Sequence, residues 1–208
     1  KIEQEALKKE SWNPLALLGL GLAEIKQGEL DAGTLQIQNA VTHDPNSSIL
    51  RSYLGNAYFE QRLNEPSARQ LAIAKELDPL DPTPWFYDAL RKQLDNRPVE
   101  ALRDLNHSIS LNNNRAPYRS QLLLQEDAAT RQASVARIYQ DLGFGQLGAQ
   151  VAAAALDRNP ASASLHRFFA DTVGQQRRQE LVRLSETFKA QLLEPPNNVP
   201  FSPQLAYA

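Results

Sequence analysis

The side chains that could carry acid–base or metal chemistry are few and far apart. The three histidines are His43, His107 and His166. A metal site on a helix needs a second histidine or a carboxylate three or four residues away, within a set of three or four ligands. Asp104 precedes His107 by three residues, but one pair does not complete such a set. We therefore interpret Asp104 and His107 as a solvated contact on a helix face.

Nucleophile and phosphate motifs are equally weak. Ser162 and Ser164 precede His166, but without the glycines of the strand–turn–helix elbow that exposes a catalytic serine. The stretch GFGQLG at 143–148 has a loose glycine spacing, yet it follows a helical pattern, whereas phosphate-binding loops follow a strand. The sequence therefore predicts no enzymatic activity, no metal and no cofactor.

Composition narrows the class of partner. The formal net charge is −2 and the isoelectric point about 6.0, which disfavours bulk binding of nucleic acid or of an anionic membrane. No apolar run approaches the roughly 20 residues of a membrane-spanning helix, so we expect no direct membrane span. The 208 residues contain no cysteine, which excludes disulfides and cysteine-ligated zinc among them. That absence fits the periplasm or the cell exterior, and also many cytoplasmic proteins.

Two amphipathic helical patterns lie back to back between residues 48 and 81. The first covers 50–61 and the second 66–77, each with apolar residues at three- and four-residue spacing. Gly55 and Ala74 are small, and we expect them where the two antiparallel helices approach each other. A proline in the first turn of the second helix and an Asp-Pro pair after it are typical of helix boundaries.

The same pattern returns at a fixed period along the sequence. A small residue recurs at three fixed offsets, and a turn closes each unit. The first offset holds Gly21, Gly55 and Ala89, the second Gly33, Ser67 and Ala101, and the third Ala40, Ala74 and Ser108. Unrelated amphipathic helices would not keep this register. The sequence therefore predicts three consecutive units at 14–47, 48–81 and 82–115.

A fourth unit follows out of phase at 129–162, with Ala136, Gly148 and Ala155 at the three offsets. The units resemble the tetratricopeptide repeat (TPR), a helix–turn–helix of about 34 residues. The resemblance implies an all-α fold in which helix pairs stack as a right-handed solenoid. It also implies a role in protein recognition without specifying the partner, because one scaffold serves many functions.

The remaining segments complete the predicted organisation. We interpret residues 1–11 as the end of a preceding repeat. Residues 116–128 form an insertion, which is either a binding loop that bulges from one face or a surface loop or extra helical turn. Residues 163–193 are predicted to be a capping helix pair with a solvated charged face. The charges concerned are Arg177, Arg178, Glu180, Arg183 and Glu186.

The tail, residues 194–208, has four prolines and cannot be helical, so we expect it to be extended. Its apolar residues Phe201, Leu205 and Tyr207 are unusual in a free linker. They are predicted to anchor the tail on a neighbouring domain or chain, and a disordered tail is the alternative.

Two apolar features are predicted to pack against another part of the protein or against a partner. The first helix, at 15–27, is apolar on nearly all sides, so we expect a preceding repeat or a partner to pack on it. Trp85 occupies a position where TPR units commonly carry tryptophan, and we interpret it as part of the core between repeats.

Residues after about 81 carry a more particular resemblance. The stretches DPTPWFYDALRKQLDNRPVEAL, YRSQLLLQED, ARIYQDLGFGQL, SLHRFFAD and LSETFKAQLLEPPN resemble the TPR region of certain large bacterial envelope proteins. In those proteins an outer-membrane β-barrel follows the array. The resemblance implies a periplasmic location, with an adjoining barrel as a possible neighbour. The stretch VGQQRRQE departs from it, and no barrel strands occur in these residues.

The first helices of TPR units line a concave groove, and their offsets predict a binding face. The residues at those offsets are Leu18, Leu22, Ile25, Ser52, Asn56, Phe59, Phe86, Leu90, Gln93 and Arg137. Leu18 and Ser52 stand where the carboxylate clamp of chaperone-binding TPRs would need lysine, so an acidic C-terminal peptide is a poor match.

Because no catalytic or metal site is predicted, two non-catalytic functions remain. The first is a protein–protein interaction scaffold that holds a protein or peptide ligand or a neighbouring subunit. The second is the TPR part of an exopolysaccharide-export or surface-assembly protein of the outer membrane. The length of the parent gene discriminates between them, because a downstream barrel favours the second.

Overall fold

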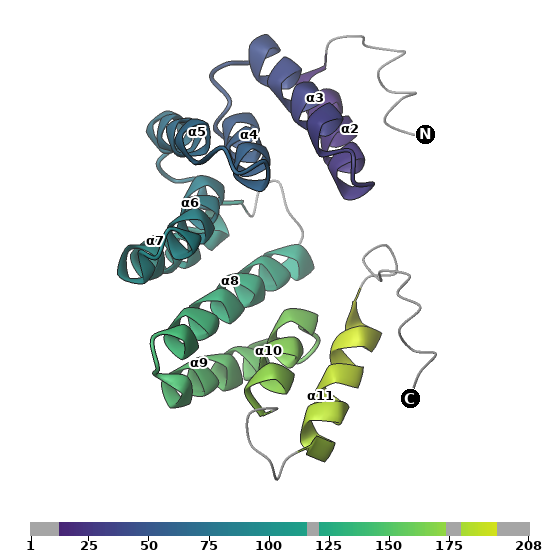
Figure 1. Ribbon diagram of the computed structural model, residues 1–208, viewed down its shortest axis with the longest axis vertical. Coiled ribbons are helices and arrows are strands. Elements are labelled where there is room, and N and C mark those ends of the chain that lie inside the picture. Colours follow the sequence, from purple (N-terminus) through teal and green to yellow (C-terminus); the bar gives the residue numbers. More distant parts are fainter. Residues whose placement is uncertain (1–12, 116–120, 174–179, 195–208) are drawn as a thin grey trace. The chain divides into compact units, whose positions relative to one another are not determined.

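The computed structural model describes residues 13–115, 121–173 and 180–194 (Figure 1). Within these ranges the regular structure consists of ten α-helices and one short 3₁₀ helix, with no strand. Adjacent helices pair as antiparallel hairpins, which confirms the predicted all-α fold of the TPR solenoid type. The chain divides into two compact units, residues 1–118 and 119–208, and each is described by itself.

The first unit contains three helix pairs in chain order. They are α2 (Pro14–Lys26) with α3 (Leu30–His43), α4 (Ser48–Glu60) with α5 (Asn64–Leu77), and α6 (Pro82–Leu94) with α7 (Pro98–Ser110). The 3₁₀ helix η1 (Asn112–Arg115) follows α7 and contacts both α6 and α7. The three pairs span residues 14–43, 48–77 and 82–110.

In the first unit, the first helix of each of the three pairs begins after a capping residue. Asn13, Ser47 and Asp81 occupy these positions. Asn13 Oδ1 accepts a hydrogen bond from the amide of Leu15 at 2.9 Å, and Asp81 Oδ1 accepts one from Thr83 at 2.9 Å. These bonds satisfy amide groups that have no partner inside the helix. The cap therefore sets where each unit starts.

The two helices of a pair approach backbone to backbone at the small residues. A Cβ atom added to Gly33 would lie 2.4 Å from the carbonyl oxygen of Gly21. Ser67 fits the same position of the second pair because its hydroxyl donates a hydrogen bond of 2.7 Å to the carbonyl of Gly55. The first two small offsets therefore mark the crossing point of the first two pairs.

Gly55 does not meet Ala74 as predicted, because a Cβ on Gly55 would instead lie nearest Leu71 and Ser67. Residues equally far from the turn meet in an antiparallel hairpin, and Ala74 lies too far along α5. Ala74 is fully buried.

The second unit contains α8 (Gln121–Asp141), α9 (Gly145–Arg158), α10 (Ala163–Val173) and α11 (Glu180–Leu193). The predicted insertion at 116–128 is helical from Gln121 onward and continuous with the rest of α8. Position 128, which corresponds to the caps of the other pairs, holds Ala128, and alanine cannot cap a helix. The helix therefore runs through this point, and Leu124 in its extra turns is buried. Residues 116–120 lie outside the described ranges.

The core of the second unit lies between α8, α9 and α10. Its fully buried side chains include Ile138, Leu165 and Phe168, with Ala152 and Ala155 from α9. Helix α11 packs on α10 through Ala190, as expected of a capping pair. Its outward face is apolar where a polar one was expected, since Leu184, Phe188 and Leu192 are exposed.

Several sequence predictions fall outside the described residues. These are the preceding repeat at 1–11, the tail anchors Phe201, Leu205 and Tyr207, and the side chains of Arg177, Arg178, Glu180 and Arg183. Among the helices that the structure describes, none is long and apolar enough to cross a bilayer.

Replacing Gly33 by alanine tests the close approach of α2 and α3. The added methyl would meet the Gly21 carbonyl, so the pair must shift, and we expect a loss of about 2 kcal/mol in the free energy of unfolding. Gly145→Ala is the control, because a Cβ there meets nothing within 4 Å. Urea unfolding followed by circular dichroism at 222 nm checks both. Equal stability of the two variants would contradict the assigned crossing point.

Candidate interaction surface

The first helices of the three pairs in the first unit form one continuous row. Contacts join α2 to α4 and α4 to α6, whereas the second helices α3, α5 and α7 make at most a marginal contact with one another within the described residues. Helices that lie closer together are on the inside of a curved stack. The row of first helices is therefore the inner side of this unit (Figure 1).

The predicted binding residues occupy three repeated offsets on this row, and the first offset is mostly buried. Leu18 packs in a core cluster with Leu17, Ile37 and Leu54. Ser52 is fully buried, and its hydroxyl donates a hydrogen bond of 2.8 Å to the carbonyl of Ser48. Neither side chain can meet a ligand.

The second and third offsets reach the surface in all three pairs. The six residues at these two offsets and Phe86 are half-buried, and we call the set the inner surface. It consists of Leu22, Ile25, Asn56, Phe59, Phe86, Leu90 and Gln93. Aromatic contacts connect α4 and α6 at this surface. The ring centroid of Tyr87 lies 5.7 Å from that of Tyr53 on α4 and 5.5 Å from that of Phe86. Leu22 and Ile25 are also packed against the apolar core cluster of α2, α3 and α4.

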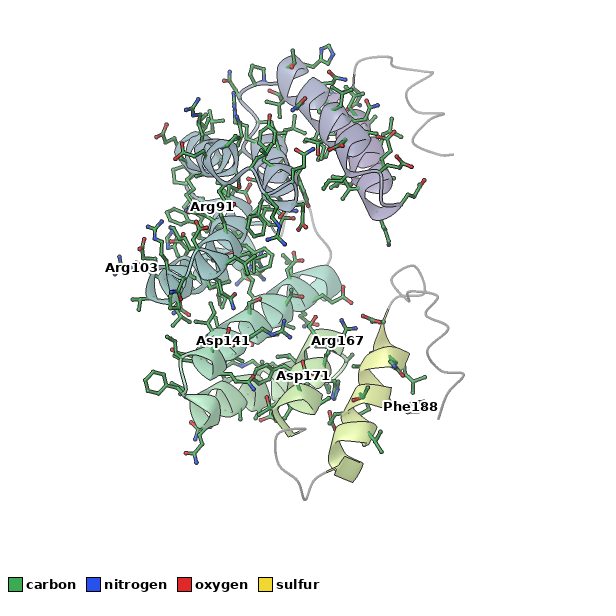
Figure 2. The ribbon with its side chains drawn as sticks, in the orientation of Figure 1. Arg91, Arg103, Asp141, Arg167, Asp171 and Phe188 are labelled. Carbon is green, nitrogen blue, oxygen red and sulfur yellow. The ribbon has the colours of Figure 1, made fainter. Side chains whose placement is uncertain are left out.

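Arg137 belongs to the second unit and is not part of the inner surface as defined. It lies on α8 and forms an exposed ion pair of 3.7 Å with Asp171 of α10. Figure 2 labels Asp171 on α10.

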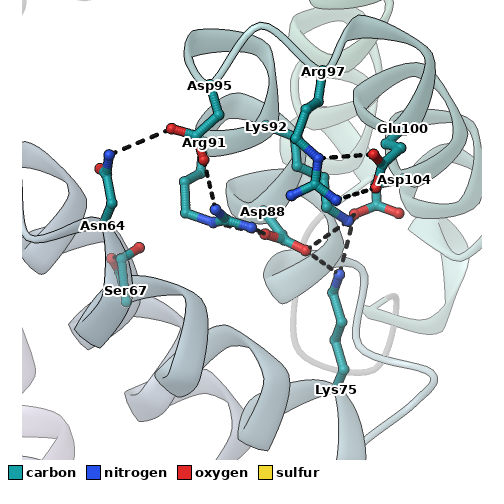
Figure 3. A network of polar contacts seen from close by, with 11 residues as sticks. Asn64, Ser67, Lys75, Asp88, Arg91, Lys92, Asp95, Arg97, Glu100 and Asp104 are labelled. Atoms are coloured by element: carbon teal, nitrogen blue, oxygen red, sulfur yellow. Dashed lines mark hydrogen bonds and ion pairs between the residues drawn. The ribbon is translucent and has the colours of Figure 1, made fainter.

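A buried charge network joins α5, α6 and α7, and the sequence reading missed it (Figure 3). Lys75 of α5 and Lys92 of α6 both contact Asp88 and Asp104. The Lys75 Nζ atom lies 2.7 Å from Asp88 Oδ2 and 3.1 Å from Asp104 Oδ2, and Lys92 Nζ lies 2.9 and 2.6 Å from the same atoms. Arg91 binds the other oxygen of Asp88 at 2.7 Å.

The network extends toward the neighbouring pair and is formally neutral. Arg91 also binds Asp95 at 2.8 Å, and Asp95 accepts a hydrogen bond of 3.4 Å from Asn64 on α5. Three cations thus balance three aspartates. Part of the network could have been found in the sequence, because opposite charges three or four residues apart on one helix can pair. Asp88, Arg91, Lys92 and Asp95 have this spacing. Their burial depends on Lys75 and Asp104, which sequence spacing cannot reveal.

The network shifts the pKa values of Asp88 and Lys92. Burial raises the pKa of the Asp88 carboxyl, but the charges and hydrogen bonds of Lys75 and Lys92 outweigh burial and hold it well below its ordinary value. Burial likewise lowers the pKa of Lys92, and its hydrogen bonds to Asp104 and Asp88 raise it overall. These groups remain charged near neutrality, which suits a structural role.

Two predicted contacts are corrected around this network. Asp104 is buried against the two lysines, so it is not a solvated partner of His107. Trp85 is half-buried between the pairs, not fully in the core. Its ring lies 4.1 Å from Lys75 Nζ and packs edge-on against His107 at 4.4 Å between centroids.

In the second unit, His166 contacts a carboxylate and a backbone carbonyl. Its Nε2 lies 2.9 Å from the Pro160 carbonyl, which only accepts, and its Nδ1 contacts the Glu186 carboxylate. The contact between His166 and Glu186 ties α10 to α11. Glu186 is thus half-buried, not part of a solvated face.

Burial raises the pKa of Glu186, but hydrogen bonds from Lys189 and His166 lower it overall. No group of three His, Asp or Glu side chains in the described ranges could hold a metal ion.

No family model and no curated protein matches the sequence. Solved structures do match the fold. PilF of Pseudomonas aeruginosa aligns with a TM-score of 0.67 at 13% identity, over 94% of this chain and 79% of its own. MamA aligns at 0.56 and 14% identity, over 83% and 93%. YrrB, titled a TPR protein with an unusual peptide-binding site, aligns at 0.52 and 14% identity, over 94% of both chains. At these identities the likeness shows a TPR-type fold.

Replacing Asp88 by asparagine tests the buried network. The substitution removes one of the two carboxylates that Lys75 and Lys92 share and leaves three buried cations facing two aspartates, so we expect a loss of about 3 kcal/mol in the free energy of unfolding. Trp85 fluorescence in a Trp12→Phe background reports urea unfolding of this unit. Glu100→Gln is the control, since it breaks only the exposed Arg97–Glu100 pair and should leave stability nearly unchanged.

The same variants give a pH dependence of known sign. The pKa of Asp88 is lower in the folded chain than its ordinary 3.8, so its stabilisation is complete above that value and is lost as pH falls below it. Between pH 5 and pH 2 the parent should lose stability more steeply than Asp88→Asn. Parallel curves would contradict the network.

Proposed function

We propose that the chain is a non-catalytic scaffold that holds a peptide segment of a partner protein on the inner surface. The observation that carries the proposal is the group formed by Phe59 on α4 and by Phe86 and Leu90 on α6. These apolar side chains are half-buried, and the polar residues Asn56 and Gln93 occupy the other surface-reaching offsets of the same two helices. A few apolar anchors flanked by amide groups suit an extended backbone, because the amides can bind peptide groups.

The charge around this surface favours an uncharged or weakly charged ligand. Lys75, Arg91 and Lys92 are already engaged by aspartates, so an acidic ligand would have to displace a buried ion pair. The inner surface itself contributes no charged side chain. A peptide-binding site is also stated for YrrB, whose fold this chain shares.

We further propose that the scaffold is periplasmic and belongs to a bacterial envelope protein. The resemblance of the stretches after residue 81 to envelope TPR regions supports this location, as does the lack of cysteine in 208 residues. An outer-membrane barrel on the same chain, in an export or surface-assembly protein, is the more specific form. An intact parent gene that encodes neither an export signal nor barrel strands would contradict the location.

A random library of displayed 12-residue peptides tests the binding proposal. Peptides selected on the purified chain should be apolar, and calorimetry gives their Kd. We expect Phe86→Ala to raise Kd about tenfold or more, which corresponds to about 1.4 kcal/mol. Leu35→Ala is the matched control, because Leu35 is exposed on the second helix α3, and it should change Kd less than twofold.

Two outcomes would contradict the proposal. One is the selection of peptides whose Kd is unaffected by Phe86→Ala and by Asn56→Ala. The other is a loss of affinity that follows Leu35, which would place the ligand on the second helices.

A further inference from the structure

In the first unit, the first helices α4 and α6 each have a face that meets the second helix of the preceding pair. Three offsets lie on this face, and their side chains are all buried: Leu50, Leu54 and Ala57 on α4, and Pro84, Asp88 and Arg91 on α6. Helix α3 packs on α4 in the apolar core cluster, and Lys75 of α5 contacts Asp88 of α6. We call these three offsets the stacking face.

The stacking face of α2 is open by comparison. Ala16, Leu20 and Ala23 occupy its three offsets and are only partly buried, and Leu15 beside them is 63% exposed. Leu54 belongs to the core cluster, whereas Leu20, at the same offset, is not among the described side chains that pack on it. No helix that the structure describes precedes α2 in the chain (Figure 1). Helix α2 therefore repeats a face that receives a helix in the next two pairs.

Glu24 adds an unsatisfied polar group at this side of α2. Its Oε2 atom is buried and has no hydrogen-bond partner among the described residues. Glu24 lies in the last turn of α2, where the negative end of the helix dipole disfavours a carboxylate. One repeat later the same offset holds Tyr58, whose hydroxyl accepts a hydrogen bond of 3.0 Å from Gln38 Nε2 on the preceding helix α3. A helix that packs before α2 can supply the corresponding donor to Glu24.

The residues of α2 define the chemistry of a helix that fits. Ala16 stands where α4 has Leu50, so an incoming helix can place a large apolar side chain there. Leu20 and Ala23 continue the apolar row. The Glu24 carboxylate follows this row, and a lysine or arginine supplies it with a charge-assisted hydrogen bond. The matching helix is therefore apolar on one face, with a cation at one end of that face.

We propose that the stacking face of α2 binds a helix of a partner protein, which packs there as the second helix of a preceding pair. The partner helix sets an apolar row against Ala16, Leu20 and Ala23, and its lysine or arginine pairs with Glu24. The stacking face and the inner surface use different offsets of α2, so substitutions distinguish the two.

A displayed library of helical hairpins, with one face of one helix randomised, tests the proposal. Hairpins are selected on the intact chain carrying Phe86→Ala, which weakens the inner surface, and calorimetry on the parent gives their Kd. We expect an apolar row with lysine or arginine at one fixed position. Leu20→Glu should raise Kd about tenfold or more. Circular dichroism checks that this variant is folded.

Glu24→Gln separates the ion pair from the apolar packing. It should raise the Kd of the selected hairpins about tenfold. A hairpin whose cation is replaced by glutamine should bind the parent and Glu24→Gln equally. Glu60→Gln is the matched control, because Glu60 is exposed on α4, and it should change Kd less than twofold.

The proposal is overturned if no selected hairpin is sensitive to Leu20→Glu, or if Glu24→Gln leaves the Kd unchanged. Binding that appears only after removal of residues 1–12 would assign the face to that segment of the chain. A dimer in sedimentation equilibrium that Leu20→Glu dissociates would assign it to a second copy. Hairpins that lose affinity with Phe86→Ala but not with Leu20→Glu would belong to the inner surface.

Discussion

The close approach of two helix backbones at small residues is the constraint on which the rest of this structure depends. Gly33 lies so near the Gly21 carbonyl that even a methyl group has no room, and Gly148 stands in the same relation to Ala136. A pair that crosses at such a distance buries its apolar residues within a short hairpin. Because the crossing recurs at the same place in successive repeats, each pair presents the same faces to the next. The row of first helices, and with it the inner surface, follows from that repetition.

Successive pairs cross in the same way but pack on one another through different interactions. The first junction is an apolar cluster around Leu18, Leu50 and Leu54. The second depends on the charge network of Lys75, Asp88, Lys92 and Asp104, in which burial opposes ionisation and close ion pairs restore it. A buried network with every charge paired adds geometric definition even where its net stabilisation is small. We infer that it fixes the third pair against the second.

The sequence predicted those features of the fold that depend on local spacing. The period and the small residues are both set by neighbours within one hairpin, so helix pairs and their order were predictable. Contacts between particular side chains of different helices could not be predicted in this way. Ser52 and Phe86 share one repeat offset, yet Ser52 is fully buried and Phe86 is half-buried. The continuity of α8 through Ala128 was missed because a lost cap gives only a negative signal.

Amide hydrogen exchange, measured by mass spectrometry with and without a saturating peptide chosen by selection on the intact chain, tests the central claim most directly. The claim is that the row of first helices receives the ligand while the second helices hold that row in place. It predicts that slowed exchange concentrates in α4 and α6, with α5 and α7 changed much less. Slowed exchange concentrated in α5 and α7, with α4 and α6 unchanged, would contradict the account.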